Sequence, residues 1–170
     1  RTKIIQLNYI EYHNMNGNQG LSAGLNLAFS LAIDAEYDFI LTMDQDSIFN
    51  KESIESMIHF IDTNNDAAIG LYASNYSRVF FDHKLNKYLV SKPRYRYNKI
   101  HKVTFAITSG SFVRIAAIKN ILPLDENYFI ANVDIDLCAQ LTVSGYMIYL
   151  VGSTVFNQPV GGTVKKSFIA

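Results

Sequence analysis

The chain has 170 residues, a length that suits one domain, and we expect residues 1–170 to form a single unit. Apolar residues make up 49% of it, which is enough for a core and excludes the disordered class. The 15 basic and 15 acidic residues cancel, so the basic excess of a general nucleic-acid binder is absent. The single cysteine, Cys138, excludes an intrachain disulfide and favours a core residue in a reducing compartment.

The first half of the chain alternates short apolar runs with helical patterns. We expect a strand over residues 4–7, an Asn- and Gly-rich loop over 14–20, and a helix from a Ser22 cap to about residue 35. The uninterrupted apolar run 39–43 predicts a strand buried on both faces of a parallel sheet. Asn50 is positioned to cap a second helix, whose apolar residues recur at helical spacing, and another strand is expected over 67–72.

The second half begins with a pattern that favours a β-hairpin, with arms at 78–81 and 88–90. After it we expect, in order, a strand (102–108), a tight loop (108–111), a short helix within 112–121, a helix (135–144) stopped by Gly145, and a strand (146–151). Basic and aromatic residues alternate over 92–102. A solvated hairpin explains them most simply, and a site for an anion or a membrane surface is the alternative.

Strands alternating with helices predict an α/β three-layer sandwich with a mainly parallel central sheet. Ligands of such folds bind beyond the carboxyl ends of the strands. Asp44 and Asp46, in the segment Asp44-Gln45-Asp46-Ser47, fall at that edge because they follow the apolar strand directly.

Two carboxylates one residue apart suit a divalent cation held against a diphosphate, since Mg²⁺ and Mn²⁺ prefer hard oxygen ligands. The triplet alone is weak, because Asp44 or Asp46 could simply cap the next turn. Both interpretations stay open from these residues alone.

Four ordered blocks together resemble the family-2 glycosyltransferases of the Rossmann-like GT-A fold, over about residues 18–161. The blocks are Asn18-Gln19-Gly20-Leu21-Ser22-Ala23-Gly24-Leu25-Asn26, the segment 39–47, Thr108-Ser109-Gly110-Ser111, and the stretch 124–138 continued by Gly145-Tyr146. The form Asp-Gln-Asp-Ser is similar to the bacterial rhamnosyltransferase branch.

This resemblance assigns a role to each matching position. Asp134 aligns with the general base, and Ser109, Gly110 and Asp136 with the acceptor side. The donor would lie against Ala23, Gly24, Asn26, Asp44 and Asp46, with Mg²⁺ or Mn²⁺ held by Asp46 and Gln158. The implied activity is inverting transfer of a sugar, with rhamnose one candidate, from a dTDP- or UDP-sugar to a glycan or lipid-linked acceptor in surface-polysaccharide synthesis.

Three departures from the family pattern bear on activity. The strands that build much of the family's nucleotide pocket would lie before Arg1, so we expect an N-terminally truncated domain. Val133 stands where the family often has Glu, and Gln158 stands where it often has a metal-binding His. A catalytically incompetent sugar-nucleotide-binding or assembly domain is therefore the main alternative.

Two further alternatives remain. Asp134 and Asp136 could serve only as acidic residues at a helix start. A metal-dependent phosphoryl hydrolase also places Asp-x-Asp after a strand, but it leaves the block 18–26 unexplained. The resemblance implies a cytoplasmic site with peripheral contact to the inner membrane face, for which Lys165-Lys166 is only a slight signal.

Overall fold

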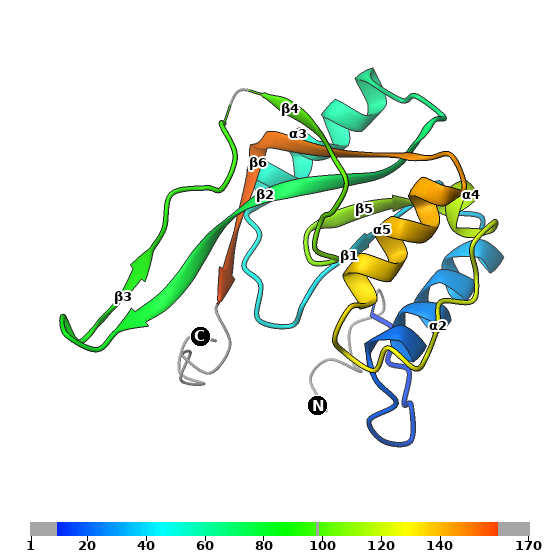
Figure 1. The fold of residues 1–170 in the computed structure, drawn as a ribbon, viewed down its shortest axis with the longest axis horizontal. Coiled ribbons are helices and arrows are strands. Elements are labelled where there is room, and N and C mark those ends of the chain that lie inside the picture. Colours follow the sequence, from blue (N-terminus) through cyan, green and yellow to red (C-terminus); the bar gives the residue numbers. More distant parts are fainter. Residues whose placement is uncertain (1–9, 98, 160–170) are drawn as a thin grey trace.

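The computed structural model describes residues 10–97 and 99–159, so the strand expected over 4–7 and the pair Lys165-Lys166 lie outside them. Within these residues one sheet is covered by helices on both faces (Figure 1). The helices are α2 (Leu21–Asp34), α3 (Lys51–Thr63), α4 (Ile115–Ile118) and α5 (Val133–Val143). The strands are β1 (Phe39–Thr42), β2 (Ile69–Asp82), β3 (Lys87–Val90), β4 (Ile100–Val103), β5 (Ser111–Arg114) and β6 (Met147–Pro159).

The sheet is mixed, which corrects the expectation of a mainly parallel one. Its order is β1-β5-β2-β6-β4, with β3 pairing the outer part of β2. Among the described strands, β2 and β6 alone pair in parallel, and the other pairings are antiparallel. The reason is that no helix intervenes between β2 and β5 along the chain, and a parallel neighbour normally requires a helical crossover. The α/β class and the three layers are confirmed.

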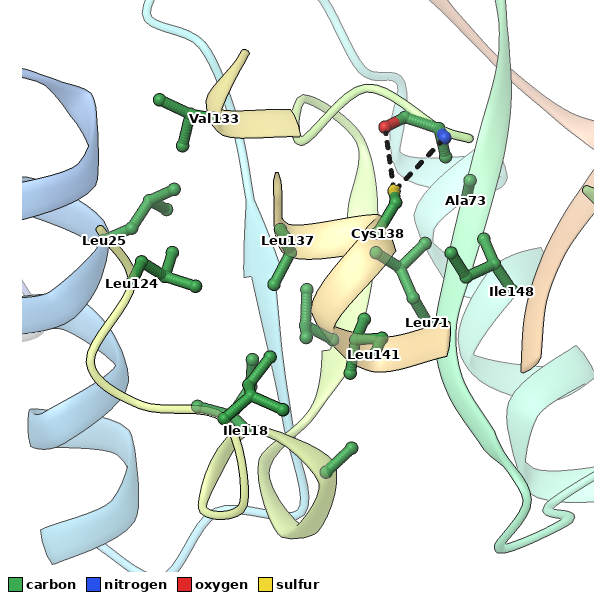
Figure 2. Close-up of a cluster of buried hydrophobic side chains, with 14 of the residues drawn as sticks. Leu25, Leu71, Ala73, Ile118, Leu124, Val133, Leu137, Cys138, Leu141 and Ile148 are labelled. Atoms are coloured by element: carbon green, nitrogen blue, oxygen red, sulfur yellow. Dashed lines mark hydrogen bonds between the residues drawn. The ribbon is translucent and has the colours of Figure 1, made fainter. Parts of the chain in front are cut away.

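Alternate residues of β2 face opposite layers. Leu71 and Ala73 pack in the larger apolar cluster with residues of α2, α4 and α5, whereas Tyr72 packs with Met57 of α3. This alternation follows from the two-residue repeat of a strand. Figure 2 shows the larger cluster, in which Leu137 and Leu141 of α5 approach the sheet.

Cys138 is a core residue, as predicted. Its side chain is buried and lies beside the backbone of Ala106, whose N–H donates to the sulfur over 3.4 Å (Figure 2). Burial raises the pKa of the Cys138 thiol to about 11, so the reactive thiolate is disfavoured.

The N-terminus of α2 is held by contacts with a distant segment rather than by a capping side chain. Gly20 occupies the cap position, and the Ser22 hydroxyl donates to the Tyr128 carbonyl over 2.6 Å instead of capping the helix. The Leu21 N–H donates to the Phe129 carbonyl over 2.6 Å. The predicted Ser22 cap is therefore wrong, whereas the predicted Asn50 cap of α3 is confirmed by its bond from the Ser53 N–H.

Strands β2 and β6 run well beyond the predicted ranges 67–72 and 146–151. Polar residues hid the extension, because Ser74, Asn75 and Ser77 suggest a loop although all are buried in β2. The Asn75 amide stays satisfied by donating to the Tyr95 carbonyl. The extended pair places the end of β6 beside the open end of the β2–β3 hairpin, since Pro159 and Val90 both pair with Val79, and it brings residues of both strands to the site.

Two other strands also depart from expectation. Strand β4 covers Ile100–Val103, earlier than the predicted 102–108. Strand β1 lies at one end of the described strand order, and only its Thr42 is fully buried. Ile40 nevertheless packs against the larger cluster, and Phe39 and Leu41 pack against the cluster of Tyr72 and Met57. Both faces of β1 are therefore covered, as predicted, although its described neighbour β5 pairs with it antiparallel.

Gly110 occupies a position where the fold leaves no room for a side chain. Its φ is +73°, and an added Cβ would lie 2.5 Å from a ring carbon of Phe156. We expect Gly110→Ala to destabilise the protein by about 2–4 kcal/mol, because backbone strain and overpacking add. Chemical denaturation measures the loss.

The matched control is Gly24→Ala in α2, where an added Cβ meets nothing within 4 Å. Alanine is the better helix former by about 1 kcal/mol, so this variant should be as stable as the parent or more so. Equal free energies of unfolding for Gly110→Ala and Gly24→Ala would contradict the close packing of Gly110 against Phe156.

Candidate active-site cleft

A cleft of about 500 Å³ opens where the ends of β1 and β6 approach the start of α5. It collects Asp44, Ser109, Asp134 and Gln158, which the sequence analysis selected from four separate segments. The other lining residues are Leu21, Tyr76, Arg78, Ile107, Thr108, Ile130 and Pro159.

The acidic segment after β1 is a tight turn closed by the Ser47 N–H, which donates to the Asp44 carbonyl over 3.1 Å. Side chains then tie this turn to its neighbours. The Asp44 N–H donates to the Ser109 hydroxyl over 3.1 Å, and the Ser47 and Ser109 hydroxyl oxygens lie 2.7 Å apart. Ser47 also donates to the Gln158 amide oxygen over 2.6 Å, while the Gln158 amide nitrogen donates to an Asp44 carboxylate oxygen over 3.1 Å. The four side chains therefore form one polar network.

Thr42, the last residue of β1, fixes the loop that carries Ser109. Its hydroxyl lies within hydrogen-bonding distance of the carbonyls of Thr108 and Ser111, and its own carbonyl accepts the Gly110 N–H over 2.8 Å. Since Thr42 is buried, these bonds form away from water and hold the loop firmly.

Asp134 is the second residue of α5 and is partly buried in the cleft. The Thr108 N–H donates to its Oδ1 atom over 2.9 Å. Among the described residues no hydrogen bond engages the other carboxylate oxygen, Oδ2. The side chain is thus oriented through one oxygen and retains a second that can accept a proton.

The negative charges of Asp44, Asp46 and Asp134 repel one another. Burial raises the pKa of the Asp44 carboxyl; the hydrogen bond from Gln158 partly offsets this, and the negative charges of Asp46 and Asp134 raise it further. Asp46 is exposed and has no hydrogen bond or ion pair within the described part of the chain. A bound cation would relieve this repulsion.

In residues 10–97 and 99–159 no group of three or more His, Cys, Asp or Glu side chains converges as a metal site. Asp44 and Asp46 nevertheless fit Mg²⁺ or Mn²⁺, which one or two carboxylates can hold together with substrate phosphates. Gln158 presents its NH₂ group to Asp44 and its oxygen to Ser47. For Gln158 to bind a metal, as predicted, its amide would have to turn and break the bond from Ser47.

The remaining predicted site residues do not line the cleft. Asp136 accepts a hydrogen bond from Gln140 over 2.7 Å and lies about 200° around the helix from Asp134. The Asn26 amide is engaged at both ends, because it donates to the Leu124 carbonyl and accepts the Leu124 N–H. Gly110 is buried beneath the cleft, and Ala23 and Gly24 lie on α2 outside it.

Sequence reasoning did not select two further residues that line the cleft, Tyr76 and Arg78. Both lie on β2, where Arg78 is paired in register with Gln158 of β6. The only signal for them was the hairpin pattern, which does not reveal the register with a strand about 80 residues later.

The profile of the family "Glycosyl transferase family 2" matches residues 2–122. This match covers well over half of the chain, and the protein therefore belongs to glycosyl transferase family 2. The mixed six-strand sheet flanked by helices is consistent with a GT-A-type, Rossmann-like domain. The matched range includes Asp44, Asp46 and Ser109 and ends before Asp134.

No curated protein matches the chain as a relative. Within the part of the chain that the structure describes, no helix is both long and apolar enough to cross a bilayer.

Replacing Asp44 by Asn tests the electrostatics of the cleft. Because the folded state raises the pKa of Asp44, it binds this proton more tightly than the unfolded chain does. Ionisation of Asp44 therefore costs the folded state stability as pH rises above the unfolded pKa. We expect Asp44→Asn to raise the denaturation midpoint at about pH 7 without divalent cations, and to lose this advantage at about pH 3, where both forms are neutral. A midpoint lowered at pH 7 would contradict the prediction.

Proposed function

We propose that this member of glycosyl transferase family 2 is an inverting enzyme that moves a sugar from a nucleoside-diphosphate donor to an acceptor hydroxyl. The observation that carries the proposal is the convergence of Asp44 and Asp134 in one cleft, although 90 positions separate them in the chain. One carboxylate is placed to serve the leaving diphosphate and the other to serve the attacking hydroxyl. A purely capping role for Asp134 does not explain why its side chain lines the cleft.

Asp134 is proposed as the general base. Its Oδ1 atom is held by the Thr108 N–H, and its Oδ2 atom is left to accept the proton of the acceptor hydroxyl. That hydroxyl then attacks the anomeric carbon from the side opposite the diphosphate, which inverts the configuration.

Asp44 and Asp46 would hold Mg²⁺ or Mn²⁺ together with the donor diphosphate. When bound, the cation offsets the charge that develops on the departing diphosphate. The protein supports this pair through Ser109 and Ser47, which fix the turn that presents both carboxylates. Ala23, Gly24 and Asn26 remain proposed for the nucleotide side.

The finer identity rests on the resemblance of the sequence to the rhamnosyltransferase branch. It supports a dTDP- or UDP-sugar donor with rhamnose as the candidate sugar, a glycan or lipid-linked acceptor, and a role in bacterial surface-polysaccharide synthesis. Ser109, Gly110 and Asp136 remain proposed for the acceptor side. Nucleotide sugars are made in the cytoplasm, so we place the reaction there, at the inner face of the membrane.

An incompetent sugar-nucleotide-binding domain is the second candidate, and Gln158 favours it. Its amide is engaged with Ser47 and Asp44 as a hydrogen-bonding group rather than presented as a metal ligand. Donor binding without sugar transfer to any acceptor would identify this function.

Metal-dependent donor binding is the first test. We expect calorimetry to detect binding of dTDP or UDP in the presence of Mn²⁺ and to show a large loss in Asp46→Ala, because that variant removes a free carboxylate from the turn. Asp62→Ala is the control, since Asp62 is an exposed carboxylate near the end of α3 and is not part of the acidic turn. Equal affinity in both variants would remove Asp46 from the donor site.

Asp134→Asn tests the base. We expect transfer to fall by about 10²–10⁴-fold with donor binding retained, because Asn preserves the bond from Thr108 but cannot take the proton. Asp136→Asn is the comparison on the same helix. Because Asp136 lies off the cleft and is proposed only for the acceptor side, this variant should raise the KM for the acceptor and keep far more of kcat than Asp134→Asn. Unchanged turnover in Asp134→Asn would exclude it as the base.

A further inference from the structure

Arg78, the register partner of Gln158, is a cationic side chain of the cleft that no described carboxylate neutralises. It is exposed, lines the cleft, and makes no ion pair with Asp44, Asp134 or any other described residue. Its backbone is fixed on both sides, since its N–H donates to the Ser91 hydroxyl and its carbonyl accepts the Ser91 N–H, each over 2.9 Å. An unpaired guanidinium on a fixed strand is suited to an anionic ligand.

The register places Arg78 next to the proposed reaction centre. Arg78 of β2 pairs with Gln158 of β6, and Gln158 donates to the Asp44 carboxylate. Tyr76, two residues earlier on β2, lines the same cleft. The Arg94 guanidinium donates to the Tyr76 hydroxyl over 3.3 Å, so a second positive charge stands behind this wall.

Charges of both signs meet in the cleft. Its lining includes the carboxylates of Asp44 and Asp134, which suit a cation, and the guanidinium of Arg78, which suits an anion. The segment that follows β2 is also basic, since residues 83–124 contain nine Lys and Arg residues and no Asp or Glu.

A small recess continues the cleft beyond Tyr76 and Ile107, which line both. It measures about 10 Å³, room for about one water molecule, and its lining includes Ser74. The Ser74 hydroxyl is buried and has no hydrogen-bond partner in the described chain. A phosphate group is too large for this recess, so the position left for an anion is at the cleft, beside Arg78.

The geometry points to Arg78 as the binding residue for a phosphate group carried by the acceptor. The inference rests on the proposed function, in which the donor diphosphate belongs to Asp44 and Asp46 with their cation. Apolar Leu21, Ile107 and Ile130 line the same cleft, so an acceptor with a phosphate joined to an apolar chain matches both surfaces. Arg78 would hold that phosphate while the acceptor hydroxyl reaches Asp134.

The test measures binding of geranyl diphosphate and of glucose 1-phosphate to the purified chain in EDTA. Without divalent cations the carboxylates repel both probes, so any binding reports on the positive charge of Arg78 in the cleft. We expect binding that weakens with salt and falls about tenfold or more in Arg78→Gln. Arg78→Lys should recover part of the loss. Tighter binding of geranyl diphosphate would indicate a lipid-linked acceptor, and tighter binding of glucose 1-phosphate a sugar phosphate.

Arg96→Gln is the matched control, because Arg96 is exposed in the basic segment 83–124 but does not line the cleft. Equal losses in Arg78→Gln and Arg96→Gln would overturn the inference, as would failure of the parent protein to bind either probe. A loss confined to Mn²⁺-dependent dTDP or UDP binding would assign Arg78 to the donor and also overturn it. The proposed function is tested separately by nucleotide binding of the parent, so its failure is distinguishable.

Discussion

The site depends on the hydrogen bonds by which Thr42 at the end of β1 holds the loop 108–111. Through Thr108, Gly110 and Ser111 these bonds fix the loop that carries Ser109 under the acidic turn and directs the Thr108 N–H at Asp134. The loop can pass so closely only because Gly110 has positive φ and no Cβ to meet Phe156. The loop 108–111, fixed by Thr42, therefore positions both proposed catalytic carboxylates, Asp44 and Asp134.

The carboxylates proposed to bind a cation lower the stability of the folded protein when no cation is bound. The carboxylate of Asp44 is partly desolvated beside the negative charges of Asp46 and Asp134, which raises its pKa and destabilises its ionised form. The hydrogen bond from Gln158 offsets part of this cost. Such a site is poised for a cation, which would stabilise the folded state by the free energy of binding.

The two long strands explain how charges of both signs meet in the cleft. Because β2 and β6 stay paired as far as Val79 and Pro159, they carry Arg78 and Gln158 beyond the body of the sheet to the cleft. The acidic residues arrive from the turn after β1 and from the start of α5. The basic and acidic residues of the cleft thus come from different segments, which the topology of the chain brings together.

The sequence by itself determined the class of fold and most of the candidate site residues that meet in the cleft. The local patterns of Asp44-Gln45-Asp46-Ser47, the Asn50 cap, the Gly145 stop and the hairpin 78–90 need only neighbouring residues, so they could be predicted. Tertiary structure alone decided the mixed strand order, the length of β2 and β6, the start of α2 on the Phe129 carbonyl, and the placement of Arg78 beside Gln158 in the cleft. These features arise from hydrogen bonds and packing between segments far apart in the chain, and no local pattern encodes which distant partner will satisfy a buried polar group.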